Sequence, residues 1–338
     1  MRLPVLPFSP RRSSRAAPTA VGARPPGDPP LFDEALLARL GRLVLLSGRS
    51  WATGVAGEHR SRRRGSSPEF ADFKSYSQGD DFRRIDWNTY ARLDSLFVRL
   101  SEVTTELTVH LLLDASDSMD WRGDPAWPTK FDYARRLVGA IGYVALWRFD
   151  RLTVVPFGDT LGTAFGPAQG RAHIVPLLRR LEGTVPLGRT ALAATVDRYV
   201  RERRRPGMLY LVSDLLSGEP TELRDLLRSL RARGWQATVL HVVDEAEIAP
   251  ALTGRYLAAG APDIGRPAVE LIEAETGERL RLTPTDDLLV RYATAIGGWL
   301  AEVEAVCHDE EALYVRLVTN WDLGDVVLGL LHRHGVVA

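Results

Sequence analysis

The sequence predicts an α/β protein with a doubly wound, mostly parallel sheet and a small N-terminal accessory unit that is rich in aromatic residues and contains β-structure. Apolar segments that suit buried strands alternate with amphipathic helical segments from about residue 108 to 250, the pattern of a parallel sheet covered on both faces. Before them, residues 68–99 carry a series of aromatic side chains around a turn-forming QGDD segment. This grouping predicts a separate packed unit.

Composition narrows the class of protein. Of 338 residues, 45% are hydrophobic, and 43 basic side chains balance 43 acidic ones. Without a global positive field, we expect no nucleic-acid partner. Cys307 is the only cysteine, which excludes an intramolecular disulfide and a cysteine-built zinc cluster and favours the reducing cytoplasm.

The N-terminal part falls into a tail and the accessory region. Residues 1–30, rich in Pro and Arg, predict a disordered tail, and no apolar run approaches the roughly 20 residues of a membrane span. Residues 31–107 hold a short amphipathic helix and the accessory unit. Each of two features there has two possible interpretations. The basic loop 57–65 either contacts phosphate or is simply solvated. The charged residues of the QGDD segment either form a ligand site or pair with one another to hold the turn.

Residues 108–250 form the predicted main domain, and 251–338 are expected to pack on it. Buried strands are expected at 108–114, 151–158, 208–216 and 236–244, with a short edge strand within 161–168. Amphipathic helices are expected at 130–149, 171–183, 191–203 and 221–234. In the C-terminal part, the pattern predicts a hairpin at 268–282, a helix from 285 to about 307, a strand at 313–318 and a final helix at 325–335.

Three polar loops follow or face the carboxyl ends of the predicted strands: DASDS at 114–118, PLGRTAL at 186–192 and VSDLLSGE at 212–219. Ligands of open α/β sheets bind at that edge, and alternate residues of an extended segment point to the same side. The side chains expected to converge are Asp114, Ser116, Ser118, Thr190 and Asp214. Hydroxyl and carboxylate oxygens suit Mg²⁺ or Mn²⁺. The alternative is an ordinary turn in which these residues cap the next helix.

DASDS with Thr190 and Asp214 resembles the metal-ion-dependent adhesion site of von Willebrand factor A domains. The resemblance implies that Ser116, Ser118 and Thr190 bind the metal directly, and that Asp114 and Asp214 bind it directly or through water. A cation held largely by neutral hydroxyls keeps excess positive charge. We therefore expect a protein partner that offers an acidic side chain to the metal.

A second resemblance covers residues 57–245. The elements Glu69-Phe70, Gly79-Asp80-Asp81, Ile85-Asp86-Trp87 and Ala91-Arg92, followed by the serine-rich loop, resemble bacterial proteins of the domain of unknown function 58 family. These proteins carry a von Willebrand factor A-like domain and are often encoded beside MoxR-type AAA+ ATPases. Gln78 stands where the family commonly has proline, which affects the rigidity of the turn.

These observations lead to a functional hypothesis. We expect a non-catalytic module that binds a protein partner in a metal-dependent manner, working as an adaptor or substrate-recruiting partner of a MoxR-type AAA+ ATPase in a chaperone-like assembly. The alternative is a Mg²⁺-dependent enzyme that processes phosphoesters. The sequence lacks the GxGxxG, P-loop, HExxH and GxSxG patterns, and Ser116 stands where an aspartyl-phosphate enzyme would need a second carboxylate.

Overall fold

The chain divides into two units, which are described separately: residues 1–48 together with 107–338, and residues 49–106. The computed structural model describes residues 31–46, 70–76, 85–93, 95–101, 106–186, 188–203, 205–248, 269–272, 275, 277–283 and 285–337. The predicted tail 1–30, the basic loop 57–65 and the QGDD segment 78–81 lie outside these residues.

The larger unit is built on a six-stranded sheet in the order β10-β7-β6-β3-β4-β5. Its strands are β3 (Thr108–Asp114), β4 (Arg151–Phe157), β5 (Phe165–Ala168), β6 (Met208–Ser213), β7 (Gln236–Val243) and β10 (Leu313–Val318). All neighbours pair in parallel except β5, which pairs antiparallel with β4 at one edge. The predicted α/β class, the mostly parallel sheet and the short edge strand are confirmed.

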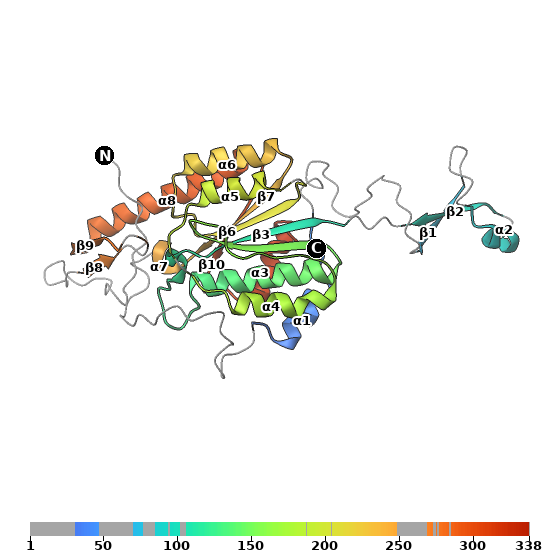
Figure 1. Ribbon diagram of the computed structural model, residues 1–338, viewed down its shortest axis with the longest axis horizontal. Helices are drawn as coiled ribbons and strands as arrows, with labels where there is room; N and C mark the ends of the chain where they lie inside the picture. The colour runs from blue at the N-terminus through green and yellow to red at the C-terminus, as the bar shows by residue number, and fades with distance from the viewer. Residues whose placement is uncertain are drawn as a thin grey trace. The chain divides into compact units, whose positions relative to one another are not determined.

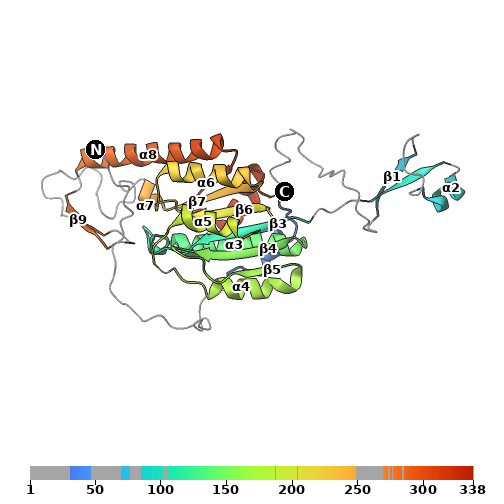
Figure 2. The ribbon, with the colours of Figure 1, turned by 45° about the horizontal axis from the view of Figure 1, so that its top comes forward.

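Helices cover both faces of this sheet (Figures 1 and 2). One face carries α1 (Glu34–Leu40), α3 (Lys130–Trp147) and α4 (Ile174–Glu182); the other carries α5 (Leu192–Arg201), α6 (Pro220–Ala232) and α8 (Asp286–Asp309). Strand β3 shows why the sheet needs both layers. Leu111 and Leu113 belong to the core under α3, whereas Leu112 between them belongs to the core under α5 and α6, as the alternation of side chains in a strand requires.

Shorter elements complete the larger unit. They are the 3₁₀ turns Asp117–Asp120 and Arg171–His173, α7 (Glu245–Ile248), the antiparallel hairpin of β8 (Val269–Ile272) and β9 (Arg279–Leu282), α9 (Leu323–Asp325), a π-helical turn Val326–Leu330 and α10 (Leu331–Arg333). The predicted C-terminal hairpin, long helix and strand are therefore present, and the predicted final helix is broken by the π turn.

Two predicted domain boundaries are wrong. The first placed the helix near residue 34 with the accessory unit, yet it belongs to the larger unit because Leu40 is fully buried in the core beside α3. Two carbonyl oxygens of this segment also accept hydrogen bonds from α3 and the residue after it: Leu31 from Arg136 and Leu43 from Arg148. The second boundary, at residue 250, is wrong because β10 lies after it in the chain and yet pairs with β7 in the main sheet.

The smaller unit contains β1 (Phe70–Ser75) paired antiparallel with β2 (Phe97–Ser101), and the helix α2 (Trp87–Leu93) between them. Asp86 is buried and its carboxylate accepts a hydrogen bond from the Thr89 amide at 3.2 Å, so it caps α2. A β-containing unit is confirmed. Its aromatic residues are not all packed inside, because the Trp87 side chain is 61% exposed and contacts Tyr90 edge to face.

Within the described residues, no helix has both the length and the apolar character needed to cross a membrane.

Candidate functional site

A polar cluster lies at the carboxyl ends of the two central strands, β3 and β6. The chain leaves β3 toward β4 on one side and later returns to place β6 on the other side. This is the switch point at which open α/β sheets bind ligands. Asp114 is the last residue of β3, Asp214 follows β6 directly, and Thr190 lies in the loop before α5.

The serine loop turns sharply after β3. The Ala115 amide donates to the Phe157 carbonyl at 2.7 Å, which extends the pairing with β4 by one residue. The Ser116 amide then donates to the Asp114 carboxylate at 3.0 Å, and Ser116 precedes the 3₁₀ turn Asp117–Asp120. The loop thereby directs the side chains of Ser116 and Ser118 to one point, since their hydroxyl oxygens lie 3.0 Å apart.

The structure brings all five predicted site residues together. The Thr190 hydroxyl donates to Asp114 Oδ1 at 2.9 Å, and the Ser118 side chain is hydrogen-bonded to Asp214. Asp114, Ser116, Ser118 and Asp214 are at most 2% exposed, and Thr190 is half-buried. The polar cluster, as we call these five residues, is thus a connected set of oxygen atoms at the edge of the sheet.

Lys130 is the most important residue that the sequence interpretation missed. It opens α3, is fully buried, and its ammonium donates to the carboxylates of Asp214 at 2.8 Å and Glu247 at 2.5 Å. The sequence held only a weak signal: a lysine in the first turn of a helix opposes the helix dipole, and a nearby carboxylate offsets that cost.

Other contacts that the sequence did not predict hold the loops of the polar cluster in place. Ser213 donates from its hydroxyl to Asp114 Oδ2 at 2.5 Å and accepts from the Leu215 amide. Asp117 joins the loop 114–118 to the loop 186–192: its amide donates to the Gly188 carbonyl, and its carboxylate accepts from the Gly188 amide. Gly188 has a φ of 82°, a backbone conformation that favours glycine.

The pKa values of the two carboxyl groups in the polar cluster are shifted in opposite directions. Burial and the neighbouring charge of Asp214 raise the pKa of Asp114 to about 6. Burial would also raise the pKa of Asp214, but the Lys130 ammonium outweighs it and holds that pKa below its usual value. For Lys130, burial lowers the pKa and the two carboxylates raise it, with a net increase. Lys130 and Asp214 therefore form a permanent ion pair beneath the hydroxyl groups.

The donor set fits a hard divalent cation better than any soft one. Three hydroxyls and two carboxylates supply only oxygen. Both carboxylates are already engaged: Asp114 accepts from Ser116, Thr190 and Ser213, and Asp214 accepts from Lys130, Ser118 and the Leu216 amide. The described residues include no group of three or more His, Cys, Asp or Glu side chains that could hold a metal, so a cation here depends on the serine and threonine hydroxyls.

The fold and the polar cluster define an open α/β protein with a potential ligand site at the switch point of its sheet. The family model described as "Protein of unknown function DUF58" matches residues 72–297. The chain belongs to this family.

Two uncharacterized proteins, from Mycobacterium tuberculosis and Mycobacterium bovis, are each 28% identical to this chain over 302 residues, covering 88% of it and 89% of the relative. A solved structure, the conserved hypothetical protein BatB from Bacteroides thetaiotaomicron, is similar with a TM-score of 0.41 and 15% identity, over 68% of this chain and 98% of that one.

Proposed function

We propose that this protein is a non-catalytic binding module of the von Willebrand factor A type, which holds Mg²⁺ or Mn²⁺ in the polar cluster and uses it to bind an acidic side chain of a protein partner. The carrying observation is the connected network of Ser116, Ser118, Thr190, Asp114 and Asp214 at the carboxyl ends of β3 and β6. The strand order, with one antiparallel edge strand, supports the fold part of the proposal.

The charge arrangement supports binding of an external carboxylate. Because Lys130 already neutralises Asp214, the cluster offers a divalent cation little compensating negative charge. The hydroxyls of Ser116, Ser118 and Thr190 would hold the cation, which would supply a Lewis-acidic position for a carboxylate from outside. Such a site binds through charge and needs no reacting group.

The proposed partner assembly includes a MoxR-type AAA+ ATPase, for which the protein would serve as an adaptor or substrate-recruiting factor. This part of the proposal is supported by the resemblance to the family alone. The metal-dependent binding of an acidic side chain does not depend on it.

Calorimetric titration with Mg²⁺ tests the metal site. The double variant Ser116→Ala/Ser118→Ala should lose at least tenfold in Mg²⁺ affinity, because it removes two neutral oxygen ligands and leaves the buried ion pair intact. Asp214 is a poor target because its removal would leave Lys130 with Glu247 as its remaining partner. Ser229→Ala, which removes a hydroxyl from the last turn of α6 that is hydrogen-bonded to Asp197 on α5, is the control. Equal affinities of all three proteins would contradict the metal assignment.

Affinity capture then tests the partner. Full-length protein is used as bait in lysate of the source cells, with Mg²⁺ or with EDTA, and bound proteins are identified by mass spectrometry. A partner retained by the wild type only with Mg²⁺, and lost with Ser116→Ala/Ser118→Ala, supports the proposal. Identical proteins in every lane, or metal-dependent turnover of a generic phosphoester by the bait, would overturn it.

A further inference from the structure

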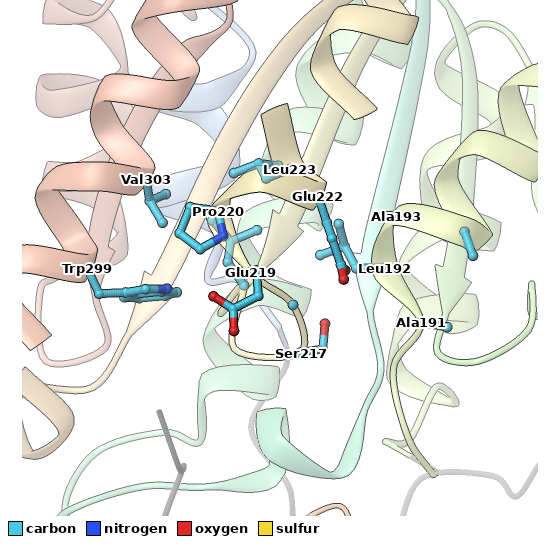
Figure 3. A pocket seen from close by; sticks show the side chains of 13 residues that line it. Ala191, Leu192, Ala193, Ser217, Glu219, Pro220, Glu222, Leu223, Trp299 and Val303 are labelled. Carbon is cyan, nitrogen blue, oxygen red and sulfur yellow. The ribbon is translucent and has the colours of Figure 1, made fainter. Parts of the chain in front are cut away.

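A groove is lined by residues that follow two members of the polar cluster in the chain (Figure 3). It lies between the loop that enters α5, the loop between β6 and α6, and helix α8, and it has a volume of 140 Å³. Ala191, at one side, follows Thr190 in the chain, and Leu215, at another, follows Asp214. The groove therefore begins where two loops of the polar cluster end.

The walls of the groove are apolar and its size suits one side chain. Leu192, Leu215, Leu223 and the Trp299 indole line it. His241 packs edge to face on Trp299, with ring centroids 5.5 Å apart, and so holds the indole in the wall. A cavity of about 150 Å³ with apolar walls accommodates a benzene ring, so this groove accommodates the stem of one long side chain.

The rim of the groove is acidic. Glu219 and Glu222, at the start of α6, are exposed and both line the opening, as Figure 3 shows. Glu219 precedes α6 without capping it through its side chain. In the described part of the chain, no ion pair or hydrogen bond to either carboxylate is found. The helix dipole accounts for acidic residues at this position, but not for an apolar groove directly beneath them.

We propose that this groove binds an arginine side chain of the protein partner. Its methylene stem would lie on Leu192, Leu215 and Leu223, and its guanidinium would lie between the rim carboxylates and the face of Trp299. A long basic side chain combines an apolar stem with a charged end, and arginine stacks on aromatic rings and pairs with carboxylates better than lysine does. The proposal deepens the proposed function, on which the protein nature of the partner rests: the partner segment would carry an acidic residue for the cation and an arginine for the groove.

The test uses the full chain labelled with 5-fluorotryptophan and ¹⁹F NMR, in EDTA, so that it is independent of the metal site. The Trp299 resonance, among those of eight tryptophans, is assigned by its loss in Trp299→Phe. The probe is arginine blocked as the N-acetyl methylamide. Blocked norleucine supplies the apolar stem without the charge, and blocked lysine supplies a different cation.

The blocked arginine should shift the Trp299 resonance and bind at least tenfold more tightly than blocked norleucine, a difference of about 1.4 kcal/mol. Glu219→Gln/Glu222→Gln should lose a similar factor, whereas Glu302→Gln/Glu304→Gln, which removes two carboxylates from α8 on either side of Val303, should keep the affinity. Added salt should weaken binding.

Three results would overturn the proposal: equal binding of arginine and norleucine, an equal loss in both double variants, or no shift of Trp299 at saturating probe. Because none of these results involves the cation, failure of the groove and failure of the metal site are read from separate experiments. If the blocked arginine binds the groove in EDTA but calorimetry detects no Mg²⁺ binding, the groove is assigned and the metal site is rejected.

Discussion

At the scale of single residues, Lys130 decides the electrostatics of the polar cluster. Its ammonium is buried between the carboxylates of Asp214 and Glu247, and the ring of Trp121 lies 5.8 Å away. Removing one partner of a buried ion pair leaves an uncompensated charge, at a cost of roughly 3–5 kcal/mol. The lysine thus compensates the negative charge of two carboxylates at the edge of the sheet.

Lys130→Met should lower the free energy of unfolding by about 3–5 kcal/mol in EDTA, because two buried carboxylates lose their counter-charge. Mg²⁺ should restore more stability to this variant than to the wild type, since a bound cation supplies the missing charge. Urea unfolding with and without Mg²⁺ measures both effects.

Arg198→Met, which removes an exposed ion pair with Glu202 at the end of α5, serves as the control and should cost about 1 kcal/mol or less. If Lys130→Met were no more destabilising than this control, the buried pair would have no structural role.

Asp114, Ser116, Ser118 and Asp214 were predictable because they lie at or just after strand ends, and alternation places the first three on one side. Thr190, in a loop between two helices, was predictable from the polar character of its loop and the resemblance to the metal-ion-dependent adhesion site. Lys130, Glu247 and Asp117 were not. Their partners are 84, 117 and 71 residues away in sequence, and a charged residue at a helix start or in a loop is ordinarily exposed.

At the scale of elements, the contact between β3 and α5 depends on a buried histidine. His110 Nδ1 lies 2.6 Å from the Tyr199 hydroxyl, and its ring meets Trp235 edge to face. Burial, followed by the positive charges of Arg203 and Arg151, lowers the pKa of His110 to about 4. The imidazole is therefore neutral in the folded protein at pH values where it is protonated in the unfolded chain.

The sign of the pH effect follows from this shift. Between pH 6.5 and 4, the unfolded chain binds a proton at His110 that the folded protein does not bind, so stability falls as the pH falls. The contribution lost between pH 7.5 and 5 is about 2 kcal/mol. His110→Gln should show a correspondingly smaller loss in urea unfolding over this range.

His173→Gln, an exposed histidine at the start of α4, should retain the pH dependence of the wild type. An unchanged pH dependence in His110→Gln as well would contradict the assignment of the acid sensitivity to the contact between β3 and α5.

At the scale of the whole molecule, residues 49–106 form an insertion into the larger unit. Described residues of the larger unit on either side of this segment, Leu43 and Leu107, are bonded to the same part of the fold. The carbonyl of Leu43, shortly before it, accepts from Arg148, and the carbonyl of Leu107, directly after it, accepts from the Arg151 amide. Both donors lie at the connection between α3 and β4.

Replacing residues 49–106 by a flexible Gly/Ser linker of about twelve residues, which spans roughly 20 Å, should leave the larger unit folded. The described residues of its apolar core clusters come from 31–45 and from 107 onward. The urea midpoint should change little, and Mg²⁺ binding, measured by calorimetry, should persist. Loss of cooperative unfolding in the replacement variant would show that the larger unit depends on the insertion.

The sheet was predictable because its strands are continuous apolar segments between helices with clear periodicity. The domain boundaries were not. The segment around α1 is bonded to α3 and the residue after it across more than 100 residues. Strand β10 joins the sheet after a helix and a hairpin that carry no signal of where the strand will pair.

The insertion and the polar cluster lie at opposite ends of the same strand. Leu107 leads directly into β3, and seven residues later Asp114 ends it, a span of about 23 Å. Tension applied between Leu107 and Asp114 would load β3 along its length. Because β3 is hydrogen-bonded to β4 on one side and β6 on the other, both ladders would resist that tension in shear, with their bonds loaded together.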